Sequence, residues 1–122
     1  MKIKNFLYFA PAFLYYILIF FVSSTSSGIS ISVPFFDKGI HCLEFAVLAF
    51  LLSIGYFKSL KSSLKTKYLI TIFSGILLGV LDEFHQYFVP QRRFEILDMI
   101  ADGVGIIIGL FVYLYLSRRV NI

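Results

Sequence analysis

The acidic residues and histidines of this 122-residue sequence are confined to three short stretches. The stretches hold Asp37, His41 and Glu44; Asp82, Glu83 and His85; and Glu95, Asp98 and Asp102. Carboxylates and imidazoles are the groups that proteins use for general acid–base catalysis and for binding metal ions such as zinc or manganese. We therefore take these stretches as the candidate site and ask whether the chain can bring them together.

Helical spacing places the polar residues of each stretch on a single face. Each residue advances about 100° around an α-helix, so Asp37, His41 and Glu44, at i, i+4 and i+7, share one side. The other two stripes are Asp82, Glu83 and Gln86 with Gly75 and Gly79, and Asp98 and Asp102 with Gly105 and Gly109. Acids scattered around helix ends among lipid headgroups would not align in this way. The spacing predicts that the three faces converge in a cleft.

Two Gly-x-x-x-Gly pairs continue these stripes. Such pairs allow two helix backbones to approach closely in lipid. We expect the last two helices to pack against each other through these glycines, with the cleft open at the other end. Incidental spacing is the alternative, because glycine is common in membrane helices.

The elements that must position these residues are membrane helices. The chain is 59% hydrophobic and 15% charged, with a mean hydropathy of +0.88, whereas soluble domains are about 45–50% apolar and about 25% charged. Four apolar runs, 6–22, 39–57, 68–88 and 96–116, are close to the ~17–25 residues of a spanning helix. They predict an all-α, integral membrane four-helix bundle that forms one domain over 1–122. The first run also resembles a secretory signal, but it is long for one and no Ala-x-Ala site follows it.

The basic residues predict the orientation and exclude one class of partner. Eight lysines and arginines fall on one side of the predicted membrane and three on the other; the eight are Lys2, Lys4, Lys58, Lys61, Lys65, Lys67, Arg118 and Arg119, and the three are Lys38, Arg92 and Arg93. By the positive-inside rule, both termini are cytoplasmic and the polar stretches face outward. The prediction is a multi-pass protein of the cell membrane, with the lipid bilayer as a partner. Nucleic acid is not expected, because the basic residues form no single patch.

Several kinds of chemistry remain open for the cleft. Asp98 with Asp102, or Glu83 with His41, could act as general acid and base. A metal is the second alternative, with His41 and Glu44 on one helix and Glu83 and His85 on another. A histidine among acids can also be only an ion-pair partner. Arg92 could grip a phosphate or carboxylate of a substrate, or anchor a turn to lipid phosphates.

The motif residues resemble the VanZ-like family of small bacterial membrane proteins, named after an accessory protein of glycopeptide resistance. The resemblance rests on Asp37-Lys38-Gly39-Ile40-His41, on the run from Asp82 to Arg92, and on Asp98 with Ala101-Asp102-Gly103-Val104-Gly105 and Gly109. It places Asp37, Lys38, His41, Glu83, Gln86, Pro90, Arg92, Asp98 and Asp102 at the family's motif positions. With the helical spacing, this gives six candidate catalytic residues, Asp37, His41, Glu83, Gln86, Asp98 and Asp102, and two candidate substrate-binding residues, Lys38 and Arg92.

Three functional hypotheses follow. The first is a cleft that binds or acts on an anionic, lipid-linked molecule of the cell envelope; through the family's namesake, the resemblance implies a link to teicoplanin resistance. The second is a proton-coupled transporter or carrier that uses the buried acids as protonatable sites. The third is a structural protein whose polar residues clamp the helices together. The sequence leaves the reaction, the cofactors, the metal and the oligomeric state open.

Overall fold

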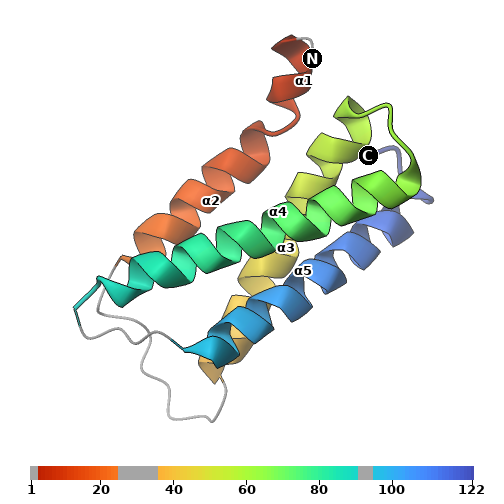
Figure 1. Cartoon of the computed structure of the whole chain (residues 1–122). Helices are drawn as coiled ribbons and strands as arrows, with labels where there is room; N and C mark the ends of the chain where they lie inside the picture. Colours follow the sequence, from red (N-terminus) through yellow and green to blue (C-terminus); the bar gives the residue numbers. More distant parts are fainter. Residues whose placement is uncertain (1–2, 25–35, 91–94) are drawn as a thin grey trace.

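The protein is a bundle of α-helices (Figure 1). The computed structural model describes residues 3–24, 36–90 and 95–122. In these ranges it forms five helices, α1 (Ile3–Leu7), α2 (Ala10–Ser23), α3 (Phe36–Ser59), α4 (Leu64–Tyr87) and α5 (Ile96–Ser117). The all-α fold class is therefore as predicted, with one more helix than expected in the described part of the chain.

The additional helix arises because the first apolar run is broken. We expected one continuous helix over 6–22, but residues 8 and 9 form a turn between α1 and α2. Pro11 lies in the first turn of α2, where its missing N–H removes no intrahelical hydrogen bond; further inside a helix it would. The prediction of a single helix was wrong for this reason. At 14 residues, α2 is about 21 Å long, shorter than the ~30 Å hydrocarbon core of a bilayer.

The other three apolar runs form the long helices that the sequence predicts. By length and composition, α3, α4 and α5 can each cross a membrane. The side chain of Ser63 caps α4 by accepting a hydrogen bond from the Thr66 backbone N–H at 3.3 Å. Helix α3 begins three residues before the predicted start, so Asp37 and Lys38 lie within its first turn.

Helix α3 lies at the centre of the bundle and contacts each of the other helices; α5 is its closest neighbour. Phe45, Leu48 and Ala49 of α3 pack with Ile106 of α5 in the fully buried apolar core. Large apolar side chains such as Phe73 and Phe111 point outward and are about two-thirds exposed or more. This arrangement suits helices that have lipid around them.

The close glycine contact differs from the predicted one. Gly105 and Gly109 of α5 pack on the backbone of α3, against the carbonyl oxygens of Cys42 and Ala46. We expected them to face the glycines of α4. Instead, Gly75 of α4 faces the side chain of Ile106. The difference has a simple physical reason. A glycine pair predicts that its face of α5 packs closely against another helix, but it does not say which one, and α3 and α4 are both long enough to be that helix.

Charge separates the two ends of the bundle. The polar end is the end where α3 and α5 begin and α4 finishes, and all seven acidic residues lie in the half of the bundle nearest to it. At the opposite end, the described basic residues are Lys4, Lys58, Lys61, Lys65, Lys67, Arg118 and Arg119. Ser59 and Asn5 share a hydrogen bond there, so α1 lies beside the end of α3 (Figure 1).

The packing of α5 on α3 makes a matched pair of glycine substitutions informative. A Cβ at Gly105 would overlap the backbone carbonyl of Cys42, whereas a Cβ at Gly103 has no neighbour within 4 Å. We expect Gly105→Ala to lower the free energy of unfolding in detergent by about 1–3 kcal/mol, the usual cost of overpacking. Gly103→Ala should leave it unchanged or raise it by up to about 1 kcal/mol, because alanine is a better helix former than glycine. Equal stability of the two variants would contradict the close α3–α5 contact.

Candidate functional site

The candidate site is a group of mostly buried polar and ionisable side chains at the polar end, here called the polar cluster. Helix α3 contributes Lys38 and His41, α4 contributes Asp82, Glu83 and Gln86, and α5 contributes Asp98 and Asp102, with Glu95 immediately before α5. Most of these side chains are less than a tenth exposed. The convergence of three polar helix faces, predicted from spacing, is present in the structure.

Lys38 is the cationic centre of the outer part of the cluster. Its ammonium group lies 2.6 Å from a carboxylate oxygen of Asp37 and 2.8 Å from one of Asp98, and it also pairs with Glu95. The Asp37 and Glu95 side chains are 64% and 41% exposed, whereas that of Asp98 is 8% exposed. Lys38 therefore links a buried carboxylate to two that reach the surface.

His41 lies one turn further along α3 and faces α5. Its Nδ1 is 3.1 Å from Oδ1 of Asp102, and its Nε2 is 3.9 Å from Oδ2 of Asp98. The two ring nitrogens thus face two carboxylates that are one turn apart on α5. This pairing fixes the ring between α3 and α5 and joins it to the carboxylate that Lys38 binds.

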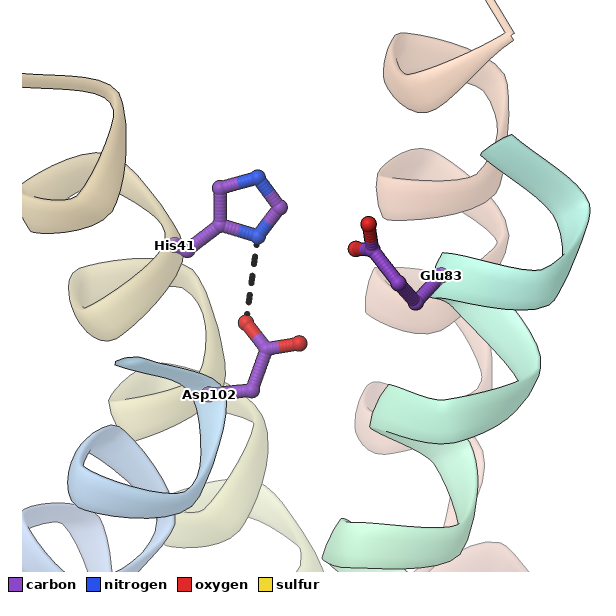
Figure 2. A group of neighbouring side chains, drawn as sticks. All are labelled: His41, Glu83 and Asp102. Carbon is purple, nitrogen blue, oxygen red and sulfur yellow. Dashed lines mark hydrogen bonds and ion pairs between the residues drawn. The ribbon is translucent and has the colours of Figure 1, made fainter. Parts of the chain in front are cut away.

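Glu83 approaches the same place from α4. Its Oε1 accepts a hydrogen bond from the Glu95 backbone N–H at 2.9 Å, so it connects α4 to the start of α5. Its Oε2 is buried and, among the described residues, has no hydrogen-bond partner. In Figure 2 the carboxylate of Glu83 points toward His41 and Asp102 from the opposite side of the cluster.

Asp82 forms a second part of the cluster, between α4 and α2. It accepts hydrogen bonds from the Ser23 hydroxyl at 2.8 Å and from the Gln86 amide at 3.2 Å. Ser23 was not among the predicted site residues, because it lies just past the end of the first apolar run, 6–22. Its position directly after the first apolar run, at the same predicted depth in the membrane as the acids, could have indicated this contact.

The predicted site residues have different outcomes. His41, Glu83, Asp98 and Asp102 come together; Gln86 instead orients Asp82, and Asp37 lies at the exposed edge beside Lys38. Arg92 and Arg93 lie outside the described residues.

Two of the predicted metal ligands, Glu44 and His85, do not lie with His41 and Glu83 in the structure. His85 lies 2.8 Å from the Ser24 hydroxyl and stacks on Phe20. Among the described residues, the group that includes His41 and Glu83 has Asp102 as its third member, in place of Glu44 and His85.

An apolar groove on α3 and α5 is separate from the cluster. It is lined by residues such as Leu43, Val47, Ile108 and Val112 and contains no ionisable side chain. We attribute it to the lipid-facing surface of this helix pair. The chemistry of the described chain is therefore concentrated in the polar cluster.

The comparisons with known proteins agree with the motif residues. A family profile described as VanZ/LLP1 matches residues 1–117, which is nearly the whole chain. The chain belongs to the VanZ/LLP1 family. No curated protein and no solved structure matches it. Family membership and the three long apolar helices make it a polytopic membrane protein.

In this VanZ/LLP1 chain, carboxylates outnumber cationic groups in the site. The described cluster and its exposed edge hold six carboxylates, from Asp37, Asp82, Glu83, Glu95, Asp98 and Asp102, beside the single ammonium of Lys38 and the imidazole of His41. Close carboxylates in an apolar surrounding favour the uptake of protons or cations. The arrangement can therefore supply proton donors and acceptors side by side, or bind a cation.

The position of Lys38 predicts a strong dependence of stability on its charge. Lys38→Met leaves the buried Asp98 of this VanZ/LLP1 chain without its cation, a change that costs about 3–5 kcal/mol in buried pairs. We expect a clear loss of unfolding free energy in detergent, and Asp98→Asn in the same chain should restore much of it. Exposed Lys65 provides the control, because Lys65→Met should change stability by less than about 0.5 kcal/mol. A Lys38→Met protein as stable as wild type would rule out this pairing.

Proposed function

We propose that the polar cluster binds, and acts chemically on, the headgroup of an anionic, lipid-linked molecule at the outer face of the cell membrane. The observation that carries this proposal is the convergence of ionisable side chains from three membrane helices at one end of the bundle. Ionisable groups inside a membrane protein are costly and usually mark a functional site. Here they lie near a helix end, which is the depth at which lipid headgroups begin.

The distribution of basic residues supports the orientation. All described lysines and arginines except Lys38 lie at the end opposite the polar cluster. Positive charge is enriched in cytoplasmic loops. We therefore propose that both termini are cytoplasmic and that the polar end of the bundle faces outward.

Lys38 and Arg92 are the proposed anion-binding residues. The Lys38 ammonium has exposed Asp37 as one of its three partners, so a substrate phosphate or carboxylate can take the place of Asp37 without disturbing buried Asp98. Arg92 lies in the segment that follows α4 in the sequence, and its guanidinium suits bidentate binding of phosphate. His41, Glu83 and Asp102 lie deeper and are the proposed proton donors and acceptors.

Family membership suggests a biological role for the proposed activity. The chain belongs to the VanZ/LLP1 family, and the family's namesake is an accessory protein of glycopeptide resistance. We propose that the lipid-linked molecule belongs to the cell envelope and that the activity bears on teicoplanin resistance.

The structure gives less support to a proton-coupled carrier or to a purely structural clamp. A carrier needs polar groups along its whole path, but the buried Ser53 and Thr71 in the other half of the bundle donate to carbonyls of their own helices. Apart from the hydroxyl of Tyr113, these two hydroxyls are the only buried polar side-chain groups described there. A clamp gains from fully paired groups, whereas oxygens of Glu83 and Asp102 have no described hydrogen-bond partner.

Co-purification of lipid tests the proposed function. We expect wild-type protein in detergent to retain an anionic lipid that native mass spectrometry detects, and Arg92→Ala to retain several-fold less, because a phosphate loses its bidentate partner. Arg118→Ala is the matched control, since Arg118 is an exposed arginine at the opposite end.

Two outcomes would reject this proposal. Equal lipid retention by wild type, Arg92→Ala and Arg118→Ala would remove the evidence for an anion-binding residue. Reporter fusions at residue 28 and at the C-terminus address the orientation. A cytoplasmic residue 28 with an external C-terminus would place the cluster on the wrong side of the membrane.

A further inference from the structure

Two buried carboxylate oxygens in the polar cluster have neither a hydrogen-bond nor an ion-pair partner among the described residues, whereas a third, Oδ1 of Asp98, lacks a hydrogen bond but lies 2.8 Å from the Lys38 ammonium. Glu83 is fully buried and Asp102 is 2% exposed, yet Oε2 of Glu83 and Oδ2 of Asp102 have no hydrogen-bond partner in the part of the chain that the structure describes. An unsatisfied buried polar atom is costly, and more so when the group is charged. Two such oxygens on neighbouring helices call for a ligand that both can bind.

The carboxylates of Glu83 and Asp102 converge with the ring of His41. One donor atom each from His41, Glu83 and Asp102 can be chosen so that all three lie within 4.8 Å of one another. Figure 2 shows the three side chains reaching toward a common point from α3, α4 and α5. Donors bound at about 2.0–2.2 Å to one metal ion lie roughly 3.0–3.6 Å apart. A closing movement of at most about 1–2 Å, within reach of side-chain rotation, brings the set to that spacing.

The surroundings also fit a metal-bound histidine. Nδ1 of His41, which lies 3.1 Å from Oδ1 of Asp102, would bind the ion in place of that contact, and Nε2 faces Oδ2 of Asp98 at 3.9 Å, which a small shift of the ring would bring to hydrogen-bond distance. Metal-bound histidines usually donate their second N–H to a carboxylate or carbonyl, which fixes the ring. Asp98 is itself held by Lys38 at 2.8 Å. Glu83 is oriented in the same manner, because Glu95 N–H binds its Oε1 and leaves Oε2 free.

A neighbouring group of acids provides a contrast within the same cluster. Asp37, Glu95 and Asp98 also have oxygens within 4.8 Å of one another. The Lys38 ammonium already binds all three of these carboxylates, so the chain supplies its own cation there. Around Glu83 and Asp102 the described residues place no lysine or arginine in contact, so this part of the cluster can accept an external cation.

We infer that His41, Glu83 and Asp102 bind one divalent transition-metal ion. One imidazole nitrogen and two carboxylate oxygens suit zinc, manganese or iron. Three protein ligands leave a coordination position open, as in catalytic metal sites, where a water or a substrate oxygen binds. The inference deepens the proposed function, because a metal beside Lys38 would bind the same anionic headgroup, but its test depends on metal content and not on lipid.

Metal content of purified protein tests the inference. Protein in detergent is stripped with a chelator, equilibrated with micromolar zinc or manganese chloride, separated from free metal and analysed by inductively coupled plasma mass spectrometry. We expect about one ion per wild-type chain and at least a tenfold loss in His41→Ala and in Glu83→Gln. His85→Ala is the matched histidine control and should retain the wild-type amount, because His85 contacts Ser24 and Phe20 instead.

Glu83→Gln keeps the inference testable even if other variants fail to fold. The glutamine has nearly the same shape and can still accept the hydrogen bond from Glu95 N–H. A folded Glu83→Gln protein with full metal content, or a wild-type protein with none, would overturn the site. If wild-type protein binds metal but retains no lipid, the metal site stands and the proposed function is rejected. If it retains lipid but binds no metal, the proposed function stands and the metal site is rejected.

Discussion

The structure depends on one constraint, which is that carboxylates inside a bundle of apolar helices must find partners within the protein. Water and mobile counter-ions are scarce there, so each charge needs a hydrogen bond, an ion pair or a proton. Lys38 meets this need for Asp98, and Ser23 with Gln86 meets it for Asp82. The needs of Glu83 and Asp102 are met only in part. The paired groups therefore position the helices, and the partly unpaired carboxylates of Glu83 and Asp102 remain available to bind a ligand.

Close backbone contact makes this arrangement possible. Gly105 and Gly109 let α5 lie directly on the backbone of α3, so side chains from the two helices meet across a short distance. His41 can then reach both Asp98 and Asp102 on consecutive turns of α5. Helix α4 completes the site from the other side with Glu83. The packing in the apolar half and the geometry of the polar half are consequences of the same helix pairing.

Much of this organisation could be predicted from sequence, because hydropathy and helical spacing are local properties. The three long helices and the convergence of His41, Glu83 and Asp102 follow from them. The break before α2 also has a local signal in Pro11, which the length of the apolar run concealed. The partner of Gly105 and the hydrogen bond from Ser23 to Asp82 could not be predicted in the same way. They depend on which helices are neighbours, and a single sequence does not specify that directly.

The central claim is that Glu83 belongs to a site and does not clamp the helices. The most direct test is the thermal stability of Glu83→Gln beside wild type, in detergent with a chelator present so that bound metal contributes to neither. The substitution keeps the hydrogen bond to Glu95 N–H and removes a buried acid from a costly surrounding. The account predicts an unfolding temperature equal to or above that of wild type, together with loss of function in cells. A Glu83→Gln protein clearly less stable than wild type would contradict it, because an ionised carboxylate that holds the fold together weakens the fold when it is neutralised.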